Sequence, residues 1–175
     1  MLWCCCGGVA DIAVTRFGTT SAPSSFLKDF ANFGYGLGSV AQEGWLFFAN
    51  VPGTFTTASL NMRIAALSSQ IQFVTDIRQS IVGLDDNPAE PNTYADVVGP
   101  SETTASTEWV MNDSDIWPTS NDYSIDVTAI LNELILRPGW TSPGNVLLRI
   151  DPNWTPINIL TCDFGGLPVP TLSFT

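Results

Sequence analysis

The densest group of oxygen ligands in this chain of 175 residues lies at residues 112–115, where an asparagine, two aspartates and a serine occur together. Calcium prefers carboxylate and carbonyl oxygens, so Asp113 and Asp115 are candidates for a calcium site. The run lacks the spaced ligands of an EF-hand loop, and Asp and Asn are common turn formers. We therefore favour a turn and expect no cofactor, with calcium as the alternative.

Six tryptophans offer flat aromatic faces, the surfaces on which sugar rings stack. Trp117 precedes a proline and Trp154 lies in the turn-like sequence Pro-Asn-Trp-Thr-Pro, which makes both candidates for contacts with a sugar. We favour for both a covering role at the edge of the fold. Trp45 lies within an apolar run and Trp140 follows a helix-stop sequence, so both are expected to anchor the core.

Catalysis finds little support in the residue types. The chain has no histidine, which removes imidazole bases, histidine-containing triads and histidine-ligated metals. A glycosidase needs two carboxylates that face each other across a cleft, and the sequence alone places no such pair. Glu133 is expected to be a solvated helix residue. We predict that the protein is not an enzyme.

The N-terminal residues 1–25 differ from the rest and are interpreted as an arm or attachment segment. Adjacent cysteines lack the spacing of a zinc site and bridge one another poorly. We interpret them, with Cys162, as reduced and partly buried thiols; a disulfide to Cys162 and lipidation are the alternatives. The residues expected to make the assembly contacts of the arm are Leu2, Trp3, Cys4, Cys5 and Cys6.

The charge balance bears on the choice of partners. The net charge is −11, and the six basic residues are scattered, so no patch could follow a phosphate backbone and nucleic acid is not an expected partner. No apolar run has the length of a membrane span. The first residues lack the basic and apolar regions of a signal peptide, so we expect synthesis in a cytoplasm without export by the usual route.

One short amphipathic helix is predicted at residues 127–136. Its apolar residues recur at helical spacing, Asp126 can cap its first turn, and Arg137 suits its carbonyl end. Pro138 and Gly139 then end it.

The rest of the chain reads as short strands separated by Pro, Gly and Asn turns, which is typical of a sandwich or barrel. Residues 83–100 are interpreted as a long polar loop with three prolines. The strands are predicted at residues 44–50, 59–66, 70–76, 107–111, 146–150, 158–162 and 171–175.

Three pieces of the chain, in order, resemble one family. The first is a strand, a Pro-Gly turn and a second strand over residues 44–64, and the second covers residues 103–117. The third runs from Asp126-Val127-Thr128 through Arg137-Pro138-Gly139-Trp140 to Gly144-Asn145, with a closing strand at 170–174. The series is similar to jelly-roll β-sandwich modules of the DNRLRE type, which resemble carbohydrate-binding modules and occur in secreted bacterial surface proteins and phage structural proteins.

The resemblance covers residues 26–175 and implies a mostly β, jelly-roll sandwich domain that follows the extended arm. It departs from the family in the arm and in a short closing region at residues 162–166.

The sandwich is of a type found in extracellular proteins, the chain shows no export signal, and it is acidic with a low density of charge. Because of these three features, we expect a non-enzymatic structural protein of a phage virion. It would be a capsid decoration protein or a tail or fibre component, anchored through its arm with the sandwich exposed. The expected partners are other virion proteins, such as the major capsid or tail protein, and copies of itself. The alternative is a carbohydrate-binding adhesion module for host polysaccharide.

Overall fold

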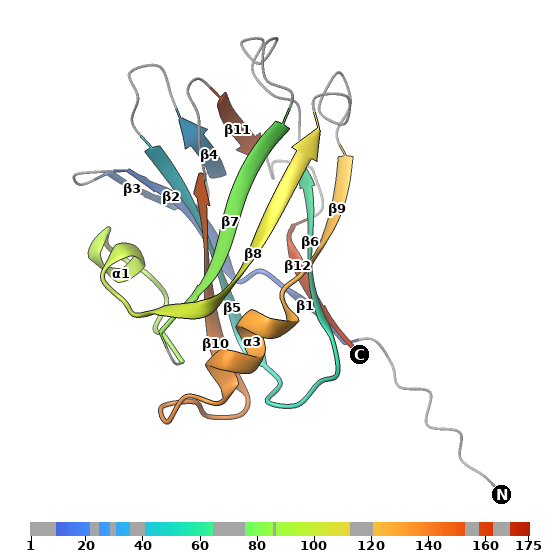
Figure 1. Cartoon of the computed structure of the whole chain (residues 1–175). Helices are drawn as coiled ribbons and strands as arrows, with labels where there is room; N and C mark the ends of the chain where they lie inside the picture. Colours follow the sequence, from blue (N-terminus) through green and yellow to red (C-terminus); the bar gives the residue numbers. More distant parts are fainter. Residues whose placement is uncertain are drawn as a thin grey trace, which may run out of the picture.

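Two antiparallel sheets packed face to face build the molecule, with a short helix across one end (Figure 1). The computed structural model describes residues 10–21, 25–28, 31–35, 41–64, 76–85, 87–112, 121–152, 158–162 and 169–175.

The first sheet contains four strands and is built around a buried row of apolar side chains. Leu60 lies opposite both Leu172 and Ile125, and all three are buried. Alternate residues of these strands face outward and are mostly polar, which is the pattern of a sheet with one solvated face. In sheet order the strands are β1 (Ala10–Ala13), β12 (Thr171–Phe174), β6 (Ala58–Ile64) and β9 (Asn121–Asp126).

The second sheet is larger, and four long strands lie next to one another in it. In sheet order these are β5 (Ala41–Val51), β10 (Gly144–Pro152), β7 (Asp76–Leu84) and, at the edge, β8 (Glu102–Asn112). Four shorter strands extend it beyond β5, where β2 pairs with β3 and β4 pairs with β11. Their bounds are β2 (Arg16–Ser21), β3 (Ser25–Lys28), β4 (Ala31–Tyr35) and β11 (Asn158–Cys162).

The strand order is that of a jelly roll. When β2, β3, β4 and β11 are set aside, eight strands remain, and we count them in chain order. The first sheet then holds strands one, eight, three and six, and the second holds two, seven, four and five. This arrangement is the double-sheet jelly roll. The predicted fold class, a mostly β jelly-roll sandwich, is confirmed.

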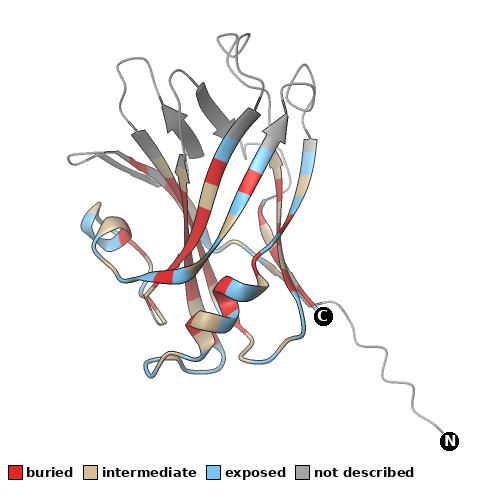
Figure 2. Cartoon of the chain, in the orientation of Figure 1, coloured by how far each residue is buried: buried red, intermediate tan, exposed pale blue. Residues whose placement is uncertain are grey.

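The core lies between the sheets and is built from buried side chains of both. Figure 2 colours the buried residues red. Leu46 and Phe48 of β5 and Leu148 and Ile150 of β10 are fully buried there. The residues between them in sequence point to the opposite face of the sheet, because side chains alternate along a strand.

The predicted helix is present as α3 (Thr128–Ile135), one residue shorter at each end than expected. Ile130, Leu131 and Leu134 are its buried stripe. The carboxylate of Asp126 accepts a hydrogen bond of 2.8 Å from the N–H of Thr128, so this aspartate does satisfy a donor at the helix start.

The helix packs closely on β7 because residue 83 is a glycine. A Cβ at Gly83 would lie 2.8 Å from Cδ1 of Leu134 and 2.9 Å from Cγ2 of Ile130.

Several predictions need correction. The segment expected to be a polar loop contains a second short helix, α1 (Ala95–Val98), so the described residues hold two helices where one was predicted. The strand expected at residues 70–76 lies outside the described residues except for Asp76, where β7 begins, and the strands β2, β3, β4 and β9 were not predicted. Residues 10–21 of the expected arm form β1 and β2, which pair with β12 and β5 inside the sandwich.

Candidate functional site

The residues that the sequence singles out as binding candidates lie outside the described part of the chain. These are Asp113 and Asp115, the two tryptophans Trp117 and Trp154, and the arm residues Leu2, Trp3, Cys4, Cys5 and Cys6. Within the described residues, no group of three or more Cys, Asp or Glu side chains is arranged to hold a metal ion.

The described tryptophans serve packing. Trp45 and Trp109 are buried, and Trp109 meets the ring of Tyr123 edge-on at 5.1 Å. Trp140 packs against the core, as predicted, and its ring lies so close to Gly144 that a Cβ there would sit 2.7 Å from the indole. None of these three rings is a platform for a sugar.

A second apolar cluster lies on the outer face of the larger sheet. Residues 87–101, which we call the strap, connect β7 to β8 and include α1. Val97 of α1 is fully buried in this cluster. The sheet residues beneath it are Trp45, Phe47, Val82, Leu84 and Leu147.

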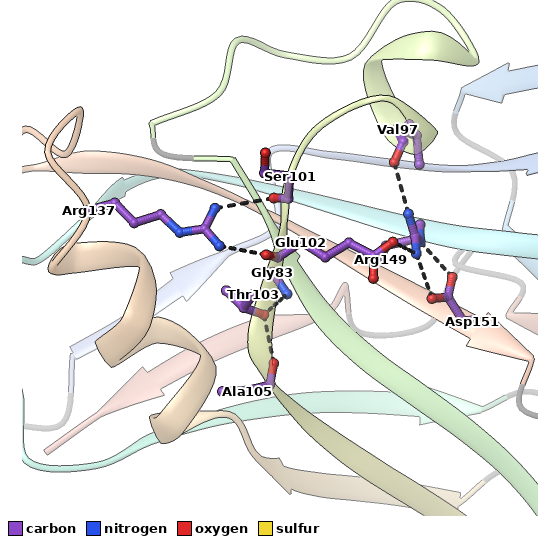
Figure 3. Close-up of polar contacts among 9 residues, drawn as sticks. All are labelled: Gly83, Val97, Ser101, Glu102, Thr103, Ala105, Arg137, Arg149 and Asp151. Carbon is purple, nitrogen blue, oxygen red and sulfur yellow. Dashed lines mark hydrogen bonds and ion pairs between the residues drawn. The ribbon is translucent and has the colours of Figure 1, made fainter.

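Beside this cluster the fold buries a charged group centred on Arg149 (Figure 3). Nε and Nη2 of Arg149 donate to the two carboxylate oxygens of Asp151 at 2.6 and 2.8 Å. Nη2 also donates to Oε1 of Glu102 at 2.6 Å, and Nη1 donates to the carbonyl of Val97 at 3.4 Å. The Arg149 side chain is only 9% exposed, whereas that of Glu102 is half exposed.

The charge of Arg149 is well supported. Burial alone would lower its pKa, but the hydrogen bonds and negative charges of Asp151 and Glu102 outweigh burial and raise it. The guanidinium therefore acts as a fixed cation that joins β10, β8 and the strap.

A third carboxylate, Glu43, faces the same group. The register pairs Ile150 with Gly44, so Glu43 and Asp151 occupy the next position on neighbouring strands. Oε2 of Glu43 is buried and has no hydrogen-bond partner in the described structure. Burial raises the pKa of Glu43, and the charge of Asp151 adds to the effect, while Arg149 opposes it.

On the opposite side of β8, a clasp joins α3 to the start of the strand. The two carboxylate oxygens of Glu133 accept the N–H groups of Thr104 and Ala105, both at 2.8 Å. Arg137 donates to the carbonyls of Ser101 and Glu102 at 3.2 and 2.7 Å (Figure 3).

The clasp corrects two expectations. Glu133, predicted to be a solvated helix residue, is a structural acceptor, and the backbone hydrogen bonds from Ala105 and Thr104 lower its pKa. Arg137 lies beyond the end of α3 and binds the β8 backbone, whereas it was predicted to suit the last turn.

A shallow groove of about 270 Å³ lies over β6, β9 and β12 of the smaller sheet. Its polar centre is the ion pair of Arg63 and Asp122, whose two hydrogen bonds are both 2.6 Å, and this pairing lowers the pKa of Asp122. The residues that line it are Asn61, Met62, Arg63, Asp122, Tyr123, Ser124, Val169 and Thr171.

Sequence reasoning missed the group around Arg149. The signal that could have found it is one arginine in an apolar strand sequence. Arg149 is the single charged residue in 146–150, and the remaining four residues are apolar. A charged residue in a buried strand is normally paired, so Arg149 predicts carboxylate partners. The sequence does not say which carboxylates these are, because Glu102 and Glu43 lie on other strands.

Comparison with known proteins gives no family for this chain: no protein-family model matches it, and no curated protein sequence does either. Among the described residues, no helix has the length and apolar character needed to cross a membrane.

Proposed function

We propose that this chain is a non-enzymatic structural protein of a phage virion, placed on the capsid surface as a decoration protein or in the tail or its fibres. The jelly-roll sandwich agrees with the resemblance to DNRLRE-type modules, some of which occur in phage structural proteins. The proposal places the sandwich outward and uses the first residues, including Leu2 to Cys6, as the anchor.

The observation that carries the proposal is the pairing of the described arginines with carboxylates of the same chain. Every described arginine forms an ion pair with a carboxylate of the same chain, so these five cations stabilise the fold and none of the five is left to bind a polyanion. With a net charge of −11, the remaining surface is acidic and suits the outside of a particle. The pairs are Arg16–Glu90, Arg63–Asp122, Arg78–Glu108, Arg137–Glu133 and Arg149 with Glu102 and Asp151.

The carboxylates on the larger sheet do not favour catalysis. A glycosidase needs an acid and a second carboxylate on either side of an open cleft. Here Arg149 lies among Glu43, Glu102 and Asp151 and binds two of them, and the buried oxygen of Glu43 is closed off from a substrate.

The partners that this proposal requires are the major capsid or tail protein and further copies of the chain. Mass spectrometry of gradient-purified particles, from a lysate of cells that carry the gene, tests the proposal. The chain should migrate with intact particles at a fixed copy number relative to the major capsid or tail protein. Recovery of the chain only at the top of the gradient would refute the proposal.

The second candidate function is carbohydrate binding, and the groove of the smaller sheet favours it. Side-chain amide, hydroxyl, guanidinium and carboxylate groups meet there, and such mixed donors and acceptors suit the hydroxyls of a sugar. Trp117 precedes the groove residue Asp122 by five positions in the sequence.

A glycan array tests this alternative with four variants. Binding should weaken at least tenfold in Arg63→Gln and in Trp117→Ala or Trp154→Ala, and should persist in Arg78→Gln, which breaks an exposed ion pair on the other sheet. An array with no bound polysaccharide would refute carbohydrate binding and leave the virion proposal standing.

A further inference from the structure

Hydrogen bonds fasten both ends of the strap. At one end Asn87 donates to Oγ1 of Thr141 at 2.8 Å and accepts from the N–H of Asn145 at 2.8 Å. At the other end the carbonyl of Ser101 accepts from the N–H of Asp85 at 2.9 Å and from Arg137 at 3.2 Å.

The middle of the strap covers the apolar cluster over Trp45 and Phe47. Val97 makes two contacts there: its side chain is buried in the cluster, and its carbonyl accepts a hydrogen bond from Nη1 of Arg149. At 3.4 Å, this is the longest of the four hydrogen bonds that Arg149 donates (Figure 3). Nη1 is therefore the guanidinium nitrogen that a new acceptor would capture most readily.

Glu43 is such an acceptor. It lies beside Asp151, and its buried Oε2 has no partner in the described structure. Ionised, it would be a third carboxylate at a single guanidinium, and a buried charge without a partner is costly. Protonated, it fits the arrangement in which Arg149 serves Asp151, Glu102 and the strap.

We propose that the strap is a pH-sensitive cover: it is closed while Glu43 holds a proton, and loss of that proton to solvent draws Nη1 of Arg149 from the Val97 carbonyl to the Glu43 carboxylate. The link between the strap and β10 is then broken, and the strap loosens over the apolar cluster. This inference is independent of the virion proposal.

The other described charged side chains around the strap have partners, whereas the buried oxygen of Glu43 has none in the described structure. Glu102 on β8 and Asp151 on β10 bind Arg149. Arg16 on β2 pairs with Glu90, and Arg78 on β7 pairs with Glu108. Asp96 of α1 accepts hydrogen bonds from the N–H groups of Asn92 and Thr93. Because burial raises the pKa of Glu43, the strap is closed in acid and loosens as the pH rises above the ordinary range of a glutamate.

Nuclear magnetic resonance of the full chain tests the cover. The side-chain carboxyl of Glu43 and the strap amides from Asn92 to Val98 are followed from about pH 4 to about pH 8. The strap amides should shift with the same midpoint as the Glu43 carboxyl. They should stay constant in Glu43→Gln, and they should titrate as in the native chain in the control Glu108→Gln.

A second variant keeps the test decisive if Glu43→Gln does not fold. Asp151→Asn removes the neighbouring negative charge and frees Arg149 for Glu43, so the common midpoint should fall by about one pH unit or more. Any one of three results would overturn the proposal. The strap amides could fail to titrate in the native chain, they could titrate unchanged in Glu43→Gln, or their midpoint could be the same in Asp151→Asn as in the native chain.

Discussion

Arg149 reaches across β7 to bind Glu102, with 2.6 Å between Nη2 and Oε1. Glu102 is the first residue of β8, and its carbonyl accepts from Arg137 on the other side of the strand at 2.7 Å. Two arginines, which follow Glu102 by 35 and 47 positions in the sequence, therefore fix the point at which the strap ends and β8 begins.

Replacing Arg149 by methionine should lower the free energy of unfolding by about 2–4 kcal/mol. Removal of one partner from a buried ion pair costs about 3–5 kcal/mol, and we reduce this because the Glu102 side chain is half exposed. The matched control is Arg78→Met, which breaks the exposed pair with Glu108 and should cost less than about 1 kcal/mol. Urea unfolding of both variants measures the difference, and equal losses would contradict the structural role of Arg149.

Glu133→Gln should remove part of the acid sensitivity of the fold. The pKa of Glu133 is lowered by the N–H groups of Ala105 and Thr104, so the carboxylate stabilises the fold above the ordinary glutamate range, and this contribution is lost as the pH falls through the lowered pKa. The urea midpoint of the native chain should thus fall more steeply than that of the variant between neutral and acidic pH. Parallel curves for the two proteins would show that Glu133 does not contribute in this way.

Much of the sandwich follows from local sequence. The short strands predicted between turn residues at 44–50, 146–150 and 158–162 lie inside β5, inside β10 and on β11, respectively. The helix prediction is correct within one residue at each end, because the apolar stripe, Asp126 and the Pro138-Gly139 stop are all local signals.

The charged group and the strap could not be predicted in the same way. Glu43, Glu102 and Arg149 come together only through the order and register of β5, β10, β7 and β8, which are long-range properties. Likewise, the polar sequence of the strap suggests a loop, and α1 is explained by one buried residue, Val97, that packs on a distant cluster. Glu133 looks solvated on a helical wheel because its partners lie outside the helix. They are backbone N–H groups of β8.

Gly83→Ala should destabilise the fold by about 1–3 kcal/mol, the usual cost of forcing an extra methyl into a packed core. The new Cβ would lie 2.8 Å from Cδ1 of Leu134 and 2.9 Å from Cγ2 of Ile130. Shortening the neighbour relieves part of the clash, so the double variant Gly83→Ala with Leu134→Val should lose less stability than the sum of the two single variants. Strict additivity in thermal or urea unfolding would mean that α3 does not depend on the glycine.

Val97→Ala tests how strongly the strap is anchored. Val97 is fully buried whereas its neighbour Val98 is only half-buried, so alanine at 97 should cost about 2 kcal/mol and alanine at 98 clearly less. Both changes have the same effect on intrinsic helix propensity, which cancels in the comparison. Similar losses in urea unfolding would show that the strap is not held through Val97.

The most direct test of the proposed function is to add purified chain back to particles assembled without it. We predict that the full chain binds saturably, at a fixed number of copies per particle, and that a chain beginning at Ala10, where β1 starts, folds but does not bind. Binding is read by co-sedimentation and the fold of the shortened chain by circular dichroism. Failure of the full chain to bind, or equal binding of a chain without its first nine residues, would contradict the proposed anchoring of a virion protein through its arm.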